Sequence, residues 1–368
     1  MKNLGFCLSS KSLLIFLYLY VFLSSKIEGF ETLLQLPRSG SSEIRPRSSR
    51  VITIADFGAK GDGLTDDTQA FENAWKMACS CPARSILLVP AGFTSLVHPI
   101  DFAGPCRSKV TLQISGAIVS PKNPESWTGL NPRKWLYFHG VNHLQVEGGG
   151  TINGRGQKWW DCKVNKTSPY HRAPTVRASF CCSICLFQYW ILLSLSNGIA
   201  MGFILLTIIL QAMTFHRCKN LKVHNLKLIN SQQMHIAFTT CNQVKASHLE
   251  VIAPASSPNT DGIHISNSHN VKIKNSIVRT GDDCISIVSN SSKIQIRNIF
   301  CGPGHGISIG SLGESGSWVQ VHDVKVDGAF LFNTDNGLRI KTWQGGNGFA
   351  SDIKFQNILM ENVLNPII

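Results

Sequence analysis

The chain has 368 residues and a net charge of +13 at neutral pH, of which residues 1–50 account for +4 and the rest for about +9. This length allows one large core, and the basic balance favours an acidic partner, either a polyanionic glycan or a nucleic acid. The sequence has no RNA-binding signature and no helix-rich basic stripe. We therefore expect an acidic polysaccharide and no nucleic acid as partner.

Residues 1–29 have the features of a secretory signal peptide: Lys2 and Lys11, an uncharged apolar run over residues 13–23, and then Ser24 and Ser25. The apolar run is too short to span a membrane. The segment predicts a secreted protein of the extracellular space or cell wall, where disulfides are stable. Asn165 and Asn290 begin N-x-Ser/Thr motifs and become candidate glycosylation sites in that compartment.

Residues 30–50 are rich in Ser, Arg and Pro without periodicity and are predicted to be a disordered linker. From residue 51 a strand runs into a Gly-rich turn, and the following Thr65-Asp-Asp-Thr-Gln predicts the start of a helix over residues 69–78. We expect this short helix to cap the first coil of a solenoid. Further strands are predicted at residues 86–89, 110–114 and 144–146, and a glycine-rich loop leads to Trp159 and Trp160, which either stack on sugar or pack under the loop.

A five-residue pattern, apolar and polar in alternation and ending in Asn, His or Asp, recurs in the second half of the chain. Its starts are 23, 27, 23, 25 and 34 residues apart. Period-2 alternation within a repeat of this size predicts a parallel β-solenoid. The six copies begin at Leu221, Val244, Val271, Ile294, Val319 and Ile353.

Four short polar runs interrupt this pattern: Asn259-Thr-Asp-Gly, Gly281-Asp-Asp-Cys, Gly304-His-Gly and Arg339-Ile-Lys. Counted back from the next repeat start, their six charged or histidine residues fall 10 to 14 positions away. Since neighbouring coils stack about 4.8 Å apart, we expect these side chains to gather on one face. A single run would more simply mark a turn, but four runs in phase favour a site. The six residues are Asp261, Asp282, Asp283, His305, Arg339 and Lys341.

These four motifs, in this order, resemble the signature set of the polygalacturonases, glycoside hydrolase family 28, from residue 51 to residue 368 apart from one segment. The resemblance implies an all-β, right-handed parallel β-helix with a short N-terminal capping helix. It also implies a monomer that needs no cofactor and no metal. The implied activity is hydrolysis of α-1,4-galacturonosyl linkages in homogalacturonan, the backbone of pectin.

The resemblance also implies the roles of individual residues. Asp282 would be the general acid, and Asp261 and Asp283 would hold the water in an inverting mechanism, whose carboxyl pairs lie ~6.5–9.5 Å apart. His305 would set the protonation or position of the acid. Arg339 and Lys341, together with Asn259, would bind the substrate and its carboxylate. Mutual repulsion of the carboxylates is expected to raise at least one pKa.

The family resemblance further implies a disulfide between Cys284 and Cys301 that braces the loop of the aspartates. Cys79 or Cys81 with Cys106 is a second candidate, whereas Cys218 and Cys241, one coil apart, can simply stack as small core residues. The cysteine spacing does not fit a zinc finger. His235 either lines the cleft or is a buried, hydrogen-bonded histidine.

Residues 176–211 have no counterpart in the family. Residues 189–210 carry no charge and are long enough for a transmembrane helix, but a span there would divide the solenoid. A membrane partner therefore follows only if this segment is truly part of the protein.

The nucleotide level offers a better explanation of this segment. Val codons begin with GT and Gln can be encoded by CAG, so Val176 and Gln211 match the usual ends of an intron of 36 codons. Its removal would join Thr175 to Ala212 and restore the strand of the family. We interpret the segment as an insert that is either a retained intron or an error of the gene prediction, and the sequences of spliced transcripts across the junction test this.

Three alternatives to a polygalacturonase stay open. A pectate or pectin lyase would use a basic residue, often with calcium, and would give unsaturated products. A rhamnogalacturonan-type hydrolase would share the fold and the chemistry. The third alternative is a truncated and inactive family member. The insert favours it, and so does the end of the sequence at Ile368, where family members continue for several coils.

Overall fold

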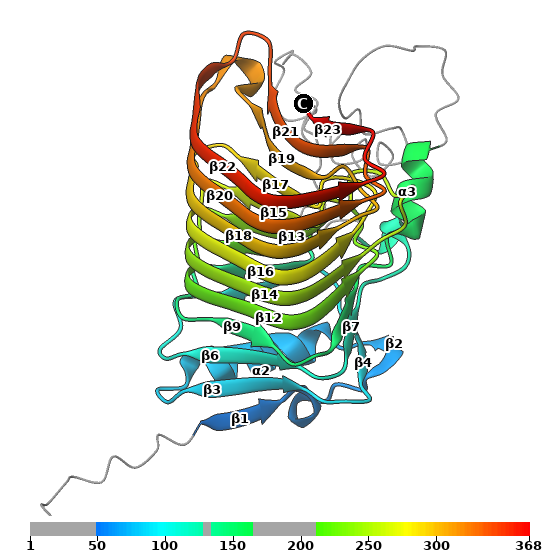
Figure 1. Ribbon diagram of the computed structural model, residues 1–368. Helices are drawn as coiled ribbons and strands as arrows, with labels where there is room; N and C mark the ends of the chain where they lie inside the picture. The colour runs from blue at the N-terminus through cyan, green and yellow to red at the C-terminus, as the bar shows by residue number, and fades with distance from the viewer. Residues whose placement is uncertain (1–48, 128–133, 165–210) are drawn as a thin grey trace, which may run out of the picture. The chain divides into compact units, whose positions relative to one another are not determined.

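The computed structural model describes residues 49–127, 134–164 and 211–368 (Figure 1). The predicted signal peptide, nearly all of the linker, Asn165 and residues 176–210 lie outside the described residues. Ser48–Ile368 forms one unit. No helix in the described part of the chain is long and apolar enough to cross a membrane.

Two parallel sheets wind around a common axis as a parallel β-helix, as the repeats predicted (Figure 1). Every strand pair in them is parallel, which the solenoid requires because each coil returns to the same side. The main path of the 14-stranded sheet is β1 (Arg50–Thr53), β3 (Ser85–Val89), β6 (Val110–Ile114), β9 (Gln145–Glu147), β12 (Lys219–Ile229), β14 (Asn242–Ile252), β16 (His269–Arg279), β18 (Ser291–Cys301), β20 (Trp318–Phe332) and β22 (Asn347–Glu361).

Four short strands join this sheet at its side: β2 (Asp62–Asp66), β4 (Thr94–Leu96), β7 (Ala117–Val119) and β10 (Thr151–Asn153). The second sheet has nine strands: β5 (Ile100–Ala103), β8 (Leu136–His139), β11 (Gln211–His216), β13 (Met234–Thr239), β15 (Ile263–Ser266), β17 (Ile285–Val288), β19 (Ile307–Leu312), β21 (Asn336–Thr342) and β23 (Asn365–Ile367). Short helical segments complete the described chain: η2 (Ile54–Phe57), α2 (Thr68–Ser80), η3 (Pro124–Trp127), α3 (Gln157–Val164) and η5 (Glu314–Gly316).

The predicted capping helix is α2, which buries Phe71 and Trp75 against the first coils. The Trp75 indole N–H donates to the Ala103 carbonyl at 3.0 Å, so its polar group is satisfied inside the core. Asp67 precedes the helix, but its carboxylate accepts from the backbone N–H groups of Lys60 and Gly61 rather than capping α2. The acid thereby holds the Gly-rich turn against the helix.

The interior is filled by ladders of like residues from successive coils. Phe102, Phe138, Phe215 and Phe238 stack with ring centroids 4.6, 5.0 and 5.6 Å apart. Cys218 and Cys241 are buried free thiols in the same core, as their one-coil spacing suggested. Trp159 and Trp160 are also buried, and the Trp160 indole N–H donates to the Ser231 carbonyl, so the packing alternative holds for this pair.

The long strands bend at a column of left-handed residues, one in each coil. Asn225, His248, Asn275, Asn298 and Asn357 all have φ between 50° and 55°. These are the fifth residues of five of the predicted repeats, and asparagine tolerates this backbone conformation better than most residues. Neighbouring side chains form a polar ladder, with Asn298 donating to Asn275 at 3.1 Å.

One predicted repeat start is wrong. Ile294 pairs with Val324, not with a residue near Val319, and Val324 pairs with Ile353. The error arises because β20 begins early, at Trp318, and Asp323 is also left-handed, with φ of 55°. Asp323 belongs to a second left-handed column, which lies one residue before each true repeat start. The two left-handed columns look alike in sequence.

Candidate active site

The polar runs meet on the outer side of the nine-stranded sheet, where three of them immediately precede its strands. Asp261, Asp283 and His305 each lie two residues before Ile263, Ile285 and Ile307, which are in register. Arg339 and Lys341 instead lie within β21, where Arg339 is in register with Ser308 of β19. The six residues do gather as predicted, although the phase that brings them together belongs to this sheet and not to the long strands.

Sequence reasoning missed a second layer of this site. The residue that follows each of the aligned apolar positions also points outward, which places His264, Ser286, Ser308 and Arg339 in one column. A signal for it exists in Asp261-Gly-Ile-His-Ile, Asp283-Cys-Ile-Ser-Ile and His305-Gly-Ile-Ser-Ile. These segments form a second repeat, 22 residues apart, that carries the site itself.

Asp283 is buried and neutralised by two cations. One of its oxygens accepts from the Ser308 hydroxyl at 2.7 Å and from the Arg339 guanidinium at 2.5 Å. The other accepts from the Lys341 ammonium at 2.9 Å. Arg339 also donates to Ser308 at 2.8 Å, so the cluster is fully hydrogen-bonded. Charge-assisted bonds of this kind hold the carboxylate in one orientation.

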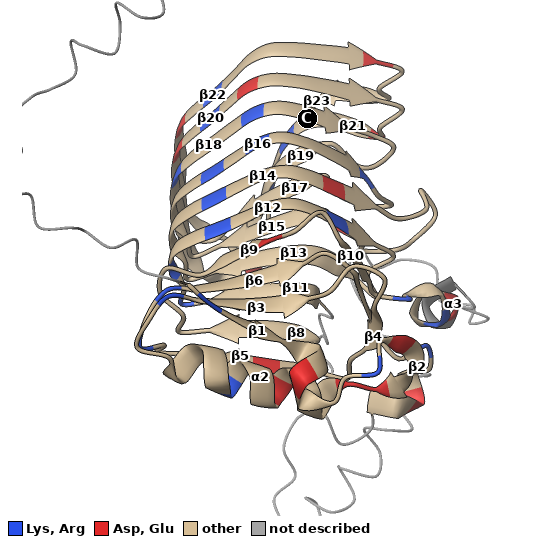
Figure 2. Cartoon of the chain, turned by 90° about the horizontal axis from the view of Figure 1, so that it is seen from below, with Lys and Arg blue, Asp and Glu red and all other residues tan. Residues whose placement is uncertain are grey.

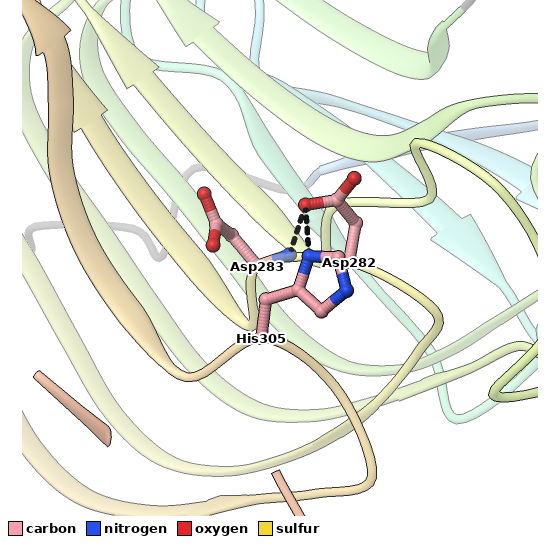
Figure 3. A group of neighbouring side chains, drawn as sticks. All are labelled: Asp282, Asp283 and His305. Atoms are coloured by element: carbon pink, nitrogen blue, oxygen red, sulfur yellow. Dashed lines mark hydrogen bonds and ion pairs between the residues drawn. The ribbon is translucent and has the colours of Figure 1, made fainter. Parts of the chain in front are cut away.

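Asp282 pairs with His305, as Figure 3 shows. The Oδ1 atom of Asp282 lies 3.0 Å from His305 Nδ1 and accepts from the Asp283 backbone N–H at 2.7 Å. The other ring nitrogen of His305 lies 3.4 Å from the exposed Asp335 carboxylate. The histidine is therefore held between two acids, with the free oxygen of Asp282 left available.

Asp261 occupies the coil before these two acids. Its Oδ2 atom accepts from the Ser286 hydroxyl at 2.9 Å, and His264 Nδ1 lies 2.8 Å from that hydroxyl and 3.9 Å from the carboxylate. Asp261 has no cation comparable to the pair on Asp283 among the described residues. The three acids therefore have three different environments.

These environments shift the pKa values in different directions. Burial raises the pKa of Asp261, and the charges of Asp282 and Asp283 add to that effect against the hydrogen bond from His264. Burial also acts to raise the pKa of Asp282, but the hydrogen bond and charge of His305 outweigh it and lower that pKa. The hydrogen bond to Asp282 in turn raises the pKa of His305. The expected raised carboxyl pKa is thus found on Asp261.

The backbone around the site explains the glycines of the motifs. Gly306 has φ of 79°, and a Cβ atom there would lie 2.1 Å from the Asn336 carbonyl oxygen. Only glycine fits, because the turn after His305 passes directly over the next coil. The Cys284–Cys301 disulfide ties the residue after Asp283 to the end of β18, and a second disulfide joins Cys79 and Cys106.

Three further predicted residues have clear positions. Asn259 is half-buried with φ of 55° in the turn before Asp261. His235 is fully buried, with one ring nitrogen accepting from the Ser231 N–H and the other 3.1 Å from the Asp261 carbonyl, and burial lowers its pKa to about 4. It is therefore a structural histidine. Asn290 is exposed on the surface, where a glycan has access.

A metal ion does not fit this group. Donor atoms of Asp282, Asp283 and His305 lie within 4.8 Å of one another, which is close enough for a shared cation. Both oxygens of Asp283, however, already accept from Arg339 and Lys341. A divalent ion would have to displace two positive charges from that carboxylate.

Comparison with known proteins identifies the family. The sequence profile described as "Glycosyl hydrolases family 28" matches residues 79–183 and 209–368. The chain belongs to glycoside hydrolase family 28. The profile is interrupted at residues 184–208, inside the segment 176–211 that we predicted to be an insert.

Plant members of the family are similar over most of the chain. A protein of Arabidopsis thaliana with the name "Probable polygalacturonase" is 54% identical over 348 residues, which cover 94% of this chain and 70% of the relative. A polygalacturonase of Persea americana is 47% identical over 94% of this chain and 67% of its own length. An exopolygalacturonase from Thermotoga maritima has the same fold, with a TM-score of 0.67 and 23% identity over 87% of this chain and 76% of that one.

Proposed function

We propose that the protein hydrolyses α-1,4-galacturonosyl linkages of homogalacturonan, with inversion at the anomeric carbon. The observation that carries this proposal is the set of three carboxylates in adjacent coils, each in a different electrostatic environment, beside two fixed cations. The names of the plant relatives, polygalacturonases, support the same substrate. Hydrolysis of a glycosidic bond needs an acid, a base and a water between suitably placed carboxyl groups.

Asp282 is the proposed general acid. Its second oxygen makes no protein hydrogen bond among the described residues, so it can approach the glycosidic oxygen. The lowered pKa of Asp282 means that, in the free protein, the proton of the Asp282–His305 pair resides mainly on the histidine. Asp282 can protonate the glycosidic oxygen when the shared proton lies on its free oxygen. His305, whose Nδ1 is 3.0 Å from the other oxygen, positions the carboxyl group and holds the proton in the free protein.

Asp261 and Asp283 are the proposed partners of the attacking water. Asp261 combines burial with a raised pKa, which suits a base that must take the proton of the water as the bond to the anomeric carbon forms. Asp283 is held in place by Arg339 and Lys341 and can orient the same water. The proton of the water passes to the Asp261 carboxylate, and the proton of Asp282 passes to the oxygen of the leaving sugar.

The two cations serve the substrate as well as Asp283. Arg339 and Lys341 together carry two positive charges, and the Asp283 carboxylate carries one negative charge. The cluster of these three residues therefore has a net positive charge. A galacturonate carboxylate brought to this point would complete the balance, whereas a neutral sugar would not. With Asn259 in the adjoining turn, this accounts for selection of an acidic polysaccharide by a secreted, monomeric cell-wall enzyme.

The test is product analysis on de-esterified homogalacturonan, with Thr175 joined directly to Ala212 in the protein. We expect new reducing ends, no rise in ultraviolet absorbance, and a first product of inverted configuration by proton NMR. Activity should persist in a chelator, because no metal is part of the scheme. Unsaturated products that depend on calcium would instead identify a lyase, and hydrolysis confined to rhamnogalacturonan would identify the other hydrolase.

A further inference from the structure

A ladder of lysines crosses the outer face of the 14-stranded sheet, on a different sheet from the candidate active site. Lys222 of β12, Lys245 of β14 and Lys272 of β16 are directly in register on three successive strands. All three are exposed, and each lies next to a buried apolar residue in the alternation of its strand. Their side chains therefore point to solvent from one line along the solenoid axis.

Two further cations widen this line into a band. Lys274 and Arg297 are exposed and in register with each other, two residues along from the ladder. The band follows two adjoining surface depressions of about 290 and 340 Å³, which share Lys245 and Lys272 in their walls. Figure 2 shows basic segments recurring on successive strands of this sheet.

The middle of the band has no acidic partner. At one end Glu147 pairs with His224 at 2.6 Å, and at the other Asp327 pairs with Arg297 at 3.4 Å. In the described part of the chain no ion pair involves Lys222, Lys245, Lys272 or Lys274. Like charges directly opposite on neighbouring strands destabilise a sheet. A row of them with no counter-charge is a cost to the fold that a bound polyanion would offset.

We propose that this lysine ladder, Lys222, Lys245 and Lys272, is a second binding surface for an acidic polysaccharide, separate from the catalytic cluster. Successive rungs are about 4.8 Å apart, so a linear polymer with a carboxylate on each sugar can lie along the axis and meet one cation after another. The identification of that polymer as homogalacturonan rests on the proposed function. The surface would hold the enzyme on the polymer between cleavages, so it would affect long chains and not short ones.

The test uses as parent the chain with Thr175 joined directly to Ala212, and compares it with Lys245→Gln/Lys272→Gln and with a control, Lys60→Gln/Lys76→Gln, which loses the same charge near the capping helix. Binding to insoluble polygalacturonate is measured by sedimentation at low salt, and hydrolysis is measured on the polymer and on a galacturonate tetramer. We expect the ladder variant to bind the polymer about threefold to tenfold more weakly, as for two exposed ion pairs. Its rate on the tetramer, its thermal midpoint and the binding of the control should not fall.

A charge-retaining variant, Lys245→Arg/Lys272→Arg, should bind as the parent does, and added salt should remove the difference between parent and ladder variant. Equal weakening in the control would show a general effect of net charge and overturn the proposal, as would unchanged binding in the ladder variant. So would equally tight, ladder-dependent binding of single-stranded DNA at matched charge. Loss of the proposed function has a separate signature: no hydrolysis of the tetramer by the parent, with binding to the polymer still measurable.

Discussion

At the scale of single residues, the site works through differences between three aspartates that look equivalent in sequence. Asp283 is tied to two cations, Asp282 to a histidine, and Asp261 to a hydroxyl. At least one raised carboxyl pKa was expected, and it belongs to Asp261, where burial is the main cause, while His305 lowers the pKa of Asp282. In the proposed mechanism, the proton needed for catalysis is therefore held by the Asp282–His305 pair and not by one carboxyl.

The first prediction concerns the acid. Asp282→Asn should reduce hydrolysis of polygalacturonate by ~10²–10⁴-fold, because the amide keeps the shape but has no transferable proton. Circular dichroism and the thermal midpoint should stay close to those of the parent. Asp323→Asn makes the same change at an exposed residue of β20 and should leave the rate unchanged. Near-normal turnover in Asp282→Asn would refute the assignment.

The second prediction concerns pH. The pair loses its last proton only as pH rises through the raised pKa of His305, so in the parent the alkaline limb of kcat/KM follows that value. In His305→Gln the proton can be held only by the Asp282 carboxyl. The ordinary pKa of an aspartate is lower than that of a histidine, so this proton is lost at lower pH. The alkaline limb should therefore move to lower pH. His269→Gln, a change of a histidine on the other sheet, is the control, and a limb that stays in place would remove His305 from this role.

The identity of the six polar residues was predictable at this scale, but their contacts were not. Motif order predicts that Asp261, Asp282, Asp283, His305, Arg339 and Lys341 come together, since solenoid coils superpose like positions. Motif order could not show that Arg339 and Lys341 form ion pairs with Asp283. Those contacts depend on whether the side chains of β21 reach the residue that lies just before β17. Ser286 and Ser308 were missed because a serine in a strand carries no signal by itself.

At the scale of elements, the coil is shaped by left-handed residues at its bends. The strands were predictable from the alternation of apolar and polar residues. The register of β20 was not, because left-handed residues lie on both sides of each repeat. Val319-Gln-Val-His-Asp satisfies the pattern in full, whereas the true repeat, Val324-Lys-Val-Asp-Gly, ends in Gly328, a glycine with φ of 79°. Only pairing with Ile294 identifies the true start. Alternation determines which face a residue takes, but left-handed residues on both sides of a repeat leave its start ambiguous.

The third prediction tests such a bend. Asn275→Ala should destabilise the protein by about 1–2 kcal/mol, because φ is 50° there and alanine bears the left-handed strain. Asn275→Gly keeps the backbone freedom and loses only the ladder hydrogen bonds to His248 and Asn298, so it should cost less. Gln295→Ala, an exposed strand residue without positive φ, should lie within about 0.5 kcal/mol of the parent in urea unfolding. Equal losses in all three variants would contradict this role of the bend.

At the scale of the whole molecule, the coils on either side of residues 176–211 belong to one continuous solenoid. β8 precedes the segment and β11 follows it, yet they pair directly through Phe138 and Phe215. Gln211, the last residue of the predicted insert, is also the first of β11, and removal of the segment would put Thr175 in its place. The sheet therefore has no position that the segment is needed to fill, in agreement with the interruption of the family match at residues 184–208.

The last prediction follows from that continuity. A solenoid tolerates a long connection between two paired strands, because loop-closure entropy grows only slowly with length. The apolar character of the segment is not tolerated in the same way. Residues 189–210 are twenty-two residues without a charge, and exposed apolar sequence of that length promotes association or membrane binding. The full chain should therefore aggregate or partition with membranes and show little hydrolysis. A variant with Thr175 joined to Ala212 should be more soluble, and a second variant that replaces residues 176–211 by a Gly/Ser linker of equal length separates apolar character from length. If the full chain purifies as a soluble, active monomer that matches both variants, residues 176–211 are part of the working protein and not an insert.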